Sequence, residues 1–402
     1  MIIGAGYEQV PAIVKATEMG CEVIATDLNP HAPGASLAHV FEVMSTNDAQ
    51  GNLAIAQQYQ VDGVMTLGSE LAVPVVAHIV ETLNLYGLSE DTALKATDKN
   101  AMREAFAVKA VPTPLSQPVA TLQEAYDFAN QYGYPVVLKP SDSSGQRGVT
   151  KVDSSAALQA SFMSAVSFAG NDYAIIERYC AGPEINVTAA VSKGKVTCLS
   201  VSNRVTAEPP HFGIAIEHIA PPAVTDKELE AIKRVSAQAI HAIGLEDGIA
   251  YPQLIMSEQG PLLIEIAARI PGGHMREVAL ACSGIDMVDV AILQALGKEA
   301  PLAICPRQQV TPAVSVKFIT VLDYPSPELI IKKISGLEQV SNETGIQFVR
   351  YHLKAGDSLP ELSSSTARFG AVIAYGESRE QACARSKKAA TMINVEFVSN
   401  IE

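Results

Sequence analysis

Short apolar runs alternate with helix-spaced apolar positions through the first 67 residues, and this alternation constrains the fold more than any other feature of the chain. Residues 1–3 form a brief apolar run, a tight Gly4-Ala-Gly6 turn follows, and residues 10–19 carry apolar side chains at helical intervals. Two further apolar runs, at 21–26 and 61–67, fit buried strands. Strands that alternate with helices predict a parallel sheet with helices on both faces.

The Gly4-Ala-Gly6 turn, together with the later Asp27, partly matches the pattern of dinucleotide-binding sheets. The third glycine of that pattern is replaced by Gln9. We therefore favour a structural connection from strand to helix, with Asp27 capping the second strand, over a cofactor site.

Composition and net charge indicate a globular protein and argue against several classes of binding partner. The 402 residues are 48% hydrophobic and 18% charged, which indicates a globular chain of two to three domains. The net charge of −14 argues against a general nucleic-acid binder and against docking on anionic lipid, although one pocket can still be positive. The six cysteines are scattered without a C-x-x-C pair, and there is neither an export signal nor an apolar run near 18 residues. We therefore expect a cytoplasmic protein with free thiols and no membrane partner.

After residue 97 the predicted elements change from strict alternation to a mixture of hairpins and helices. We predict helices at 99–109, 121–132, 226–242 and 378–392, strands at 136–139, 173–178 and 369–375, and hairpins at 185–201 and 249–266. The fold class is therefore α/β and α+β. The predicted domains are 1–96, 97–300 with a lid subdomain at about 112–185, and 301–402.

Lys139 ends an apolar strand, and a loop of small residues that contains Arg147 follows it. A lysine at the end of a strand presents a fixed cation, the loop can offer backbone N–H groups to anionic oxygens, and a guanidinium suits phosphate. The Walker A pattern is absent. The segment therefore predicts either a phosphate clamp or an ordinary polar turn.

The apolar run 175–176 leads into a polar turn that ends at Glu184. Backbone groups along an open strand edge can contact a flat heterocycle, and Glu184 can accept hydrogen bonds from sugar hydroxyls. A β-bulge with a solvated glutamate is the alternative, and spacing alone favours it.

Glu265 is a carboxylate within the mostly apolar run 261–266, and Arg269 follows it by four residues. If this run pairs with the strand that contains Gln253, the two oxygen ligands reach one face, where phosphate oxygens and water can complete a Mg²⁺ site. Arg269 is then placed to meet a developing oxyanion. A buried ion pair between Glu265 and Arg269 is the alternative.

Taken together in chain order, these segments resemble the ATP-grasp superfamily, in its carbamoyl-phosphate-synthetase and biotin-carboxylase branch. The resemblance covers nearly the whole chain, and it is most like the L-amino-acid ligases, or dipeptide synthetases. It is carried by the glycine turn, Thr97 to Arg103, Val111-Pro-Thr-Pro114, Lys139 with its loop, Glu177 to Glu184, Glu265 to Gly273, and Arg368 to Gly376. It implies a Rossmann-like first domain, a two-part domain that binds the nucleotide between two sheets, and a C-terminal α+β subdomain.

The resemblance also implies roles for individual residues. The ATP-binding set comprises Lys99, Lys139, Ser144, Gly145, Gln146, Arg147, Gly148, Glu177, Arg178, Tyr179, Cys180 and Glu184, with 144–148 as a flap over the triphosphate. The metal ligands are Gln253 and Glu265, for one or two Mg²⁺ ions or for Mn²⁺. The catalytic set comprises Lys139, Arg269 and His274, and the substrate-binding set comprises Arg269, Gly272, Gly273, His274 and Arg276.

Two metal positions depart from the family pattern. Gln253 stands where a glutamate is more frequent, and Ala267 stands where an asparagine commonly supplies a metal oxygen. Alanine has no ligand atom, so Glu265 must bind metal largely through its own two oxygens or with water. A weaker metal site or an inactive relative follows as an alternative.

The implied activity is an ATP-dependent ligation of a small carboxylate to an amine through an acyl phosphate, with amino acids as the favoured substrates. Arg276 is expected to clamp a substrate carboxylate, and His274 to assist proton removal from the amine. A purine-pathway ligase, a bicarbonate-activating carboxylase and a non-catalytic nucleotide-binding regulator are the alternatives. A homodimer is expected only by resemblance. Domains of this kind commonly begin a few residues before the short first run, which points to a clipped N-terminus.

Overall fold

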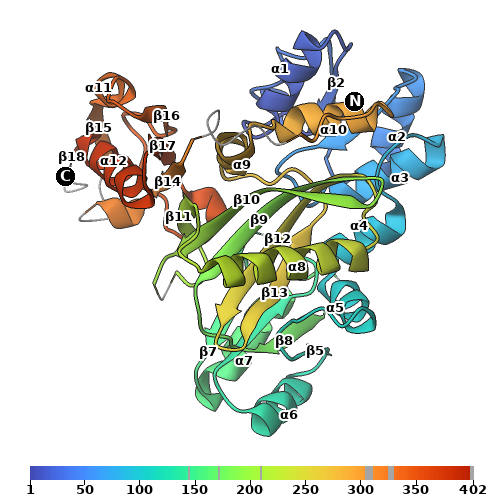
Figure 1. The fold of residues 1–402 in the computed structure, drawn as a ribbon, viewed down its shortest axis with the longest axis vertical. Helices are drawn as coiled ribbons and strands as arrows, with labels where there is room; N and C mark the ends of the chain where they lie inside the picture. The colour runs from blue at the N-terminus through green and yellow to red at the C-terminus, as the bar shows by residue number, and fades with distance from the viewer. Residues whose placement is uncertain (144, 171–172, 209–210, 304–310, 325–329, 399–402) are drawn as a thin grey trace.

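The computed structural model describes residues 1–143, 145–170, 173–208, 211–303, 311–324 and 330–398 (Figure 1). No single described helix is long and apolar enough to cross a bilayer, and the bent pair α9 (Met275–Ser283) and α10 (Met287–Ala295) meets that criterion only when its two helices are taken together.

The N-terminal unit is a four-stranded parallel sheet in the order β3-β2-β1-β4. Its strands are β1 (Ile2–Ile3), β2 (Ile24–Asp27), β3 (Val40–Val43) and β4 (Met65–Thr66). Ile2 faces a cluster that includes helix α1 (Val10–Glu18) and α10, while Ile3 faces α2 (Ala49–Gln58) and α3 (Val73–Leu83). The predicted parallel sheet with helices on both faces is confirmed.

Two of these strands are shorter than the apolar runs that predicted them. The backbone N–H of Val23 donates to the His39 ring instead of a neighbouring strand, so β2 begins only at Ile24. β4 pairs with the two-residue β1, which limits its ladder to Met65 and Thr66. The Ala5 N–H donates to Asp27 Oδ2 over 2.9 Å, which supports the structural interpretation of the glycine turn.

The segment predicted as the lid, which keeps that name below, contains a four-stranded antiparallel sheet in the order β5-β8-β6-β7, with helices α6 (Leu122–Tyr132) and α7 (Ser155–Ser167) packed on it. Its strands are β5 (Ser116–Val119), β6 (Val136–Pro140), β7 (Thr150–Val152) and β8 (Ala174–Arg178). Helices α4 (Glu90–Thr97) and α5 (Lys99–Val108) lead into it from the N-terminal unit.

An eight-stranded antiparallel sheet forms the centre of the molecule in the order β13-β12-β9-β10-β11-β14-β17-β16. Its strands are β9 (Glu184–Ser192), β10 (Lys195–Thr206), β11 (Ala215–Ala220), β12 (Gly248–Ser257), β13 (Gly260–Ala267), β14 (Ala313–Ile319), β16 (Ile346–Tyr351) and β17 (Gly370–Gly376). Alternate β9 residues such as Ile185 and Val187 share a core with helix α8 (Asp226–Ala242), as period-two patterning requires. Both predicted hairpins are confirmed.

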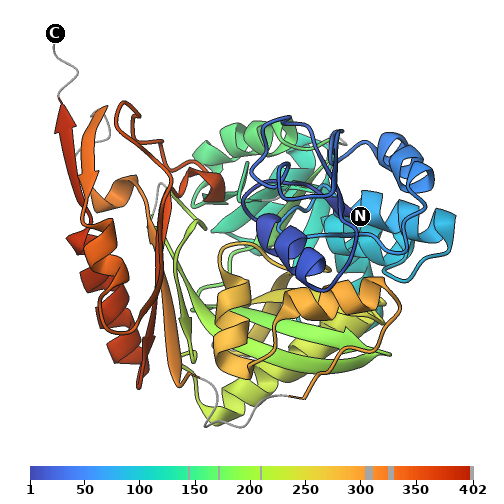
Figure 2. The ribbon, with the colours of Figure 1, turned by 90° about the horizontal axis from the view of Figure 1, so that it is seen from above.

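The last hundred residues both extend this sheet and add a small layer of their own. Strands β14, β16 and β17 continue the central sheet past residue 301, so no break in the sheet marks that predicted boundary. Within the described part of this region, the further elements are β15 (Ile330–Ser335), β18 (Asn394–Val398), α11 (Leu337–Ser341), α12 (Arg379–Met392) and the 3₁₀ turns η2 (Val321–Asp323) and η3 (Ser365–Ala367). Figure 2 shows this C-terminal part at the end of the molecule away from the N-terminal unit.

Candidate active site

A cleft of about 1390 Å³ lies between the lid sheet and the central sheet. The lid side contributes residues of β6 and β8 with the loop after β6, and the floor comes from β10, β12 and β13. Residues of the N-terminal unit and of the chain after residue 313 also line the cleft. Residues from the whole length of the chain therefore meet in one cavity.

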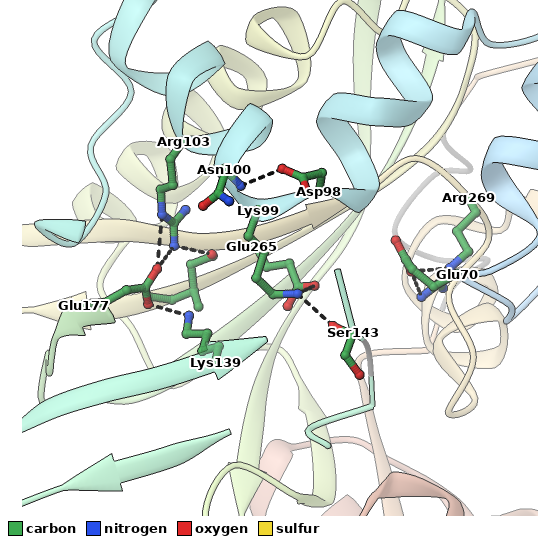
Figure 3. A network of polar contacts seen from close by, with 11 residues as sticks. Glu70, Asp98, Lys99, Asn100, Arg103, Lys139, Ser143, Glu177, Glu265 and Arg269 are labelled. Carbon is green, nitrogen blue, oxygen red and sulfur yellow. Dashed lines mark hydrogen bonds and ion pairs between the residues drawn. The ribbon is translucent and has the colours of Figure 1, made fainter. Parts of the chain in front are cut away.

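A buried ionic network joins the lid to helix α5 (Figure 3). Glu177 on β8 pairs with Lys139 on the adjacent β6 and with Arg103 from α5. Arg103 also donates to the carbonyl of Ile264 on β13 over 2.7 Å. The network therefore ties four elements together around one carboxylate that is 2% exposed.

The charges in this network control its ionisation. Burial by itself would raise the pKa of Glu177, but the Arg103 and Lys139 charges outweigh burial and hold that pKa at about 2. Burial lowers the pKa of Lys139, and the attraction of Glu177 opposes that shift. Two cations are thus positioned against a single anion, which leaves positive charge for a phosphate ligand.

Lys99 extends the cationic wall toward the loop after β6. It is the first residue of α5, whose N-cap Asp98 accepts from two backbone N–H groups. Its Nζ donates to the Ser143 carbonyl over 2.7 Å and lies 3.9 Å from Glu265 Oε1. This cation therefore lies between the loop and the predicted metal ligand (Figure 3).

The predicted flap lies where it can cover that wall. Gly145, Gln146 and Arg147 line the cleft, whereas Gly148 lines a smaller cavity of about 230 Å³. Ser144 lies outside the described residues. Gly148 has φ of +70°, and a Cβ there would lie 2.8 Å from Phe168 Cδ2, so the turn requires glycine.

The predicted nucleotide hinge follows β8 at the rim of the cleft. Arg178, Tyr179 and Cys180 line the cavity, but the N–H groups of Arg178 and Tyr179 already donate to Leu115 and Pro135 carbonyls. Contacts from these two residues to a base must therefore use other atoms. The Tyr179 ring receives the Lys151 ammonium at 4.7 Å. Burial raises the pKa of the Cys180 thiol, which favours its neutral form.

Glu184 begins β9 and lines the cleft, where it pairs with Arg204 on β10. Arg204 also donates to the Gly213 carbonyl over 2.6 Å. The solvated glutamate favoured by spacing is therefore wrong, because an arginine holds the carboxylate in place.

The two predicted metal ligands are direct neighbours. Gln253 on β12 and Glu265 on β13 are paired in register, and both line the cleft. Ala267 also lines the cleft, opposite Tyr251, and supplies no ligand atom. Among the described residues, no group of three or more His, Cys, Asp or Glu side chains can hold a metal. The donor set thus fits a hard cation that takes further oxygens from phosphate and water.

Arg269 pairs with Glu70 of the N-terminal unit and not with Glu265. Its Nε donates to Glu70 Oε2 over 2.8 Å, and both side chains line the cleft (Figure 3). The alternative of a Glu265–Arg269 ion pair is therefore wrong, because the chain turns after β13 toward the N-terminal unit, where Gly68 bonds to the Ile270 carbonyl.

The predicted substrate-binding residues divide into two groups. Gly272, Gly273 and His274 line the cleft, and the His274 ring lies 4.9 Å from that of Phe348. Arg276 does not line it, because its guanidinium binds both oxygens of Asp286, the N-cap of α10. The clamp predicted for Arg276 is therefore withdrawn.

Sequence reasoning gave no site role to four cleft-region residues: Glu70, Arg103, Arg204 and Arg368. Arg103 and Arg368 each lie in a segment that resembles the family, Thr97 to Arg103 and Arg368 to Gly376. This resemblance could have identified both as candidate site residues. Glu70 and Arg204 carry no local signal, because each is identified only by the partner that folding brings to it.

Solved structures share this architecture. An L-amino acid ligase from Bacillus licheniformis aligns with a TM-score of 0.83 at 22% identity, covering 99% of this chain and 98% of that one. Phosphoribosylglycinamide synthetase from Anaerococcus prevotii aligns with a TM-score of 0.78 at 23% identity, with the same coverage of both chains. The biotin carboxylase domain of the Hydrogenobacter thermophilus 2-oxoglutarate carboxylase aligns at 0.80 and 19%, covering 99% and 90%. At these identities the likeness shows the fold alone.

Curated relatives are also distant. An uncharacterized protein of Sinorhizobium fredii is 24% identical over 336 residues, which cover 82% of this chain and 66% of that protein. The arginine-specific carbamoyl phosphate synthase large chain of Halalkalibacterium halodurans is 26% identical over 256 residues, 60% of this chain and 24% of that one. The chain thus spans between 24% and 66% of the length of these relatives.

Two family models match the chain. Residues 327–398 match the L-amino acid ligase C-terminal domain 2. Residues 96–303, just over half of the chain, match the carbamoyl-phosphate synthase L chain, ATP binding domain. The protein therefore belongs to the ATP-grasp family of carbamoyl-phosphate synthase-type ATP-binding domains.

Proposed function

We propose that this protein is an ATP-dependent carboxylate–amine ligase that forms an amide-type C–N bond on amino acids or related small acids. One observation carries the proposal. A single cleft is lined by the cations Lys99 and Lys139, by the paired oxygen ligands Gln253 and Glu265, and by Arg269.

ATP is a substrate in this proposal, and the cleft offers each of its parts a distinct environment. The hinge at 178–180 suits the base, and Glu184, held by Arg204, suits the ribose hydroxyls. Lys99, Lys139 and the flap suit the triphosphate. Because the Glu177 carboxylate is occupied by Arg103 and Lys139, we assign it to positioning these cations instead of contacting the base.

Mg²⁺ fits the pair of Gln253 and Glu265, with phosphate oxygens and water as the remaining ligands. When bound, such an ion neutralises phosphate charge and orients the phosphoryl group. The protein's own cations act on the same charge, because Lys99 Nζ lies 3.9 Å from Glu265 Oε1. The amide of Gln253 makes this site less negative than one with two carboxylates.

The proposed reaction has two steps. A carboxylate oxygen of the acid attacks the γ-phosphorus of ATP, the bond to ADP breaks, and an acyl phosphate forms. The amine then attacks the acyl carbon, phosphate leaves, and the amine gives up a proton. Arg269 stabilises the oxyanion of the second step, and His274 is the candidate to receive the proton. The flap excludes water that would hydrolyse the acyl phosphate.

The match of residues 327–398 to the L-amino acid ligase domain supports amino acids as substrates. Ala267 favours a second candidate, a nucleotide-binding protein without catalysis, because it removes one metal oxygen. Homodimer formation and a cytoplasmic location remain predictions.

The test is phosphate release from Mg²⁺-ATP with pools of amino acids, against a blank without acid. We expect phosphate only with particular amino acids, together with a condensed product by mass. Turnover driven by bicarbonate, or by a phosphoribosylamine alone, would replace the amino-acid assignment with another ligase or carboxylase. Protection by ATP against heat with no turnover in any pool would favour the non-catalytic candidate.

A further inference from the structure

Arg368 lines the cleft, and no described acidic side chain forms an ion pair with it, in contrast to three arginines described above. Arg103, Arg204 and Arg269 pair with Glu177, Glu184 and Glu70, respectively. Arg368 precedes β17 at the C-terminal wall and lines the cleft. Its Nε donates to the Ser365 carbonyl over 2.8 Å, and its guanidinium lies 4.0 Å from the centre of the Phe318 ring.

This guanidinium lies deep in the wall, although part of its surface is open to the cleft. Burial and the nearby Arg204 charge lower the pKa of Arg368 to about 10, while attraction by Glu8 opposes the shift. The group therefore stays charged at neutral pH without a close counter-ion. A cation in that position is stabilised by any anion that reaches it.

His218 provides a second hydrogen-bond donor close to Arg368. Gly273 has φ of +66°, and a Cβ built on it would lie 3.6 Å from Arg368 Nη2 and 3.7 Å from His218 Nε2. His218 is 3% exposed, and burial with the Arg368 charge lowers its pKa well below the usual value. Its Nδ1 faces the Asn186 amide nitrogen at 3.2 Å, which leaves Nε2 as the N–H donor.

We propose that Arg368, assisted by His218, binds a second anionic group of the substrate, separate from the carboxylate that is activated beside Lys139 and Glu265. The inference rests on the proposed function and takes over the role withdrawn from Arg276. The substrate class is an amine that carries its own carboxylate, or an acid with a second carboxylate. Because Gly273 has no side chain, the space beside the Arg368 guanidinium and the His218 ring stays open to a ligand.

The test compares wild type with Arg368→Gln and Arg368→Lys, using each active substrate and its carboxamide analogue. Arg368→Gln should raise KM for the anionic substrate about 10- to 100-fold, the range of a charged hydrogen bond. KM for ATP and KM for the carboxamide should not change, and Arg368→Lys should recover part of the loss. Arg385→Gln is the matched control, because Arg385 donates to the Tyr375 carbonyl from α12, and it should behave as wild type.

Equal losses with the anionic substrate and its carboxamide would show a structural role and overturn the inference.

A ligand-binding measurement distinguishes failure of this inference from failure of the proposed function. With Mg²⁺-ADP present, glycine or succinate should raise the unfolding temperature of wild type, glycinamide should not, and Arg368→Gln should abolish the shift. A shift with glycine points to the amine as the source of the anion, and one with succinate points to the acid. Binding without turnover would sink the ligase proposal alone, and no shift with either probe would sink this inference.

Discussion

Glu177 holds two buried cations in fixed positions, since its carboxylate pairs with Arg103 from α5 and with Lys139 from β6. Removing this one carboxylate would leave two cations together in a site that excludes water. The cost of such a change is large, because an uncompensated buried charge costs more than an intact pair contributes.

We therefore predict that Glu177→Gln lowers the free energy of unfolding at pH 7 by about 3–5 kcal/mol. The pKa of Glu177 is held at about 2, below its ordinary 4.5, so its contribution is complete above pH 4.5 and is lost as pH falls toward 2. That contribution amounts to about 3 kcal/mol. Urea unfolding of wild type and Glu177→Gln at pH 7 and pH 3 measures this effect. The difference between the two proteins in free energy of unfolding should be smaller at pH 3.

Glu299→Gln is the control for this measurement, because its pair with Lys193 is fully exposed and should contribute little. A gap between wild type and Glu177→Gln that is the same at both pH values would contradict the ionisation assigned to Glu177.

Ala267 is the residue that most weakens the expected metal site. We predict that Ala267→Asn lowers the Mg²⁺ concentration for half-maximal ATP turnover several-fold, because a cleft-lining amide oxygen joins Gln253 and Glu265. The added volume should cost about 1–3 kcal/mol of stability, since Ala267 is 4% exposed. Ala268→Asn is the control, because Ala268 packs into the core beneath α8 instead of lining the cleft. An unchanged Mg²⁺ dependence would argue against metal at this position.

At the scale of elements, the connection between β6 and β7 sets the nucleotide side of the cleft. Its two ends differ in how tightly they are packed. Gly145 has φ of +72° with nothing near its missing side chain, whereas Gly148 abuts Phe168 and Pro140. The Ser365 N–H approaches the Gly145 carbonyl at 3.4 Å, so this connection also touches the C-terminal wall that carries Arg368.

Gly148→Ala should therefore raise KM for ATP about tenfold or more, because its Cβ would force the flap away from β6. Gly145→Ala should have a much smaller effect, limited to the backbone strain of about 1 kcal/mol at a left-handed position. Steady-state kinetics and protection of residues 145–148 from hydrogen exchange by ATP measure both variants. Equal effects of the two changes would mean that packing does not position the flap.

At the scale of the whole molecule, an ion pair that lines the cleft joins residues 199 positions apart. Arg269 after β13 meets Glu70 of the N-terminal unit, so the position of the proposed oxyanion-binding group depends on how that unit packs. Lys15 and Asp289 link the same unit to α10 outside the cleft, and both are partly exposed.

We predict that Arg269→Gln lowers kcat at least about 100-fold with little change in ATP binding, because a transition-state donor is lost. Glu70→Gln should lower kcat less, since Arg269 keeps its charge but loses its fixed orientation. Lys15→Gln should leave kcat unchanged. Calorimetric ATP binding and phosphate release measure these effects, and a kcat for Glu70→Gln equal to wild type would show that this pair has no positioning role.

The sequence by itself determined the elements and their class. Period-two patterns placed the two hairpins and β17 of the central sheet within a few residues, since these patterns reflect local burial. Strands β11, β14 and β16 of the same sheet were not predicted. Lys99, Lys139, Gln253 and Glu265 were recognisable because each lies in a segment that resembles the family.

Only the tertiary structure decided which charges meet. Arg269 could pair with Glu265 or with Glu70, and Arg276 could face substrate or Asp286, because the sequence fixes a side chain's position along its own element but not its distant neighbour. The continuation of the central sheet into β14, β17 and β16 likewise depends on pairing across long separations. Coulomb energy depends on the distance and burial of both partners, and these exist only after the chain has folded.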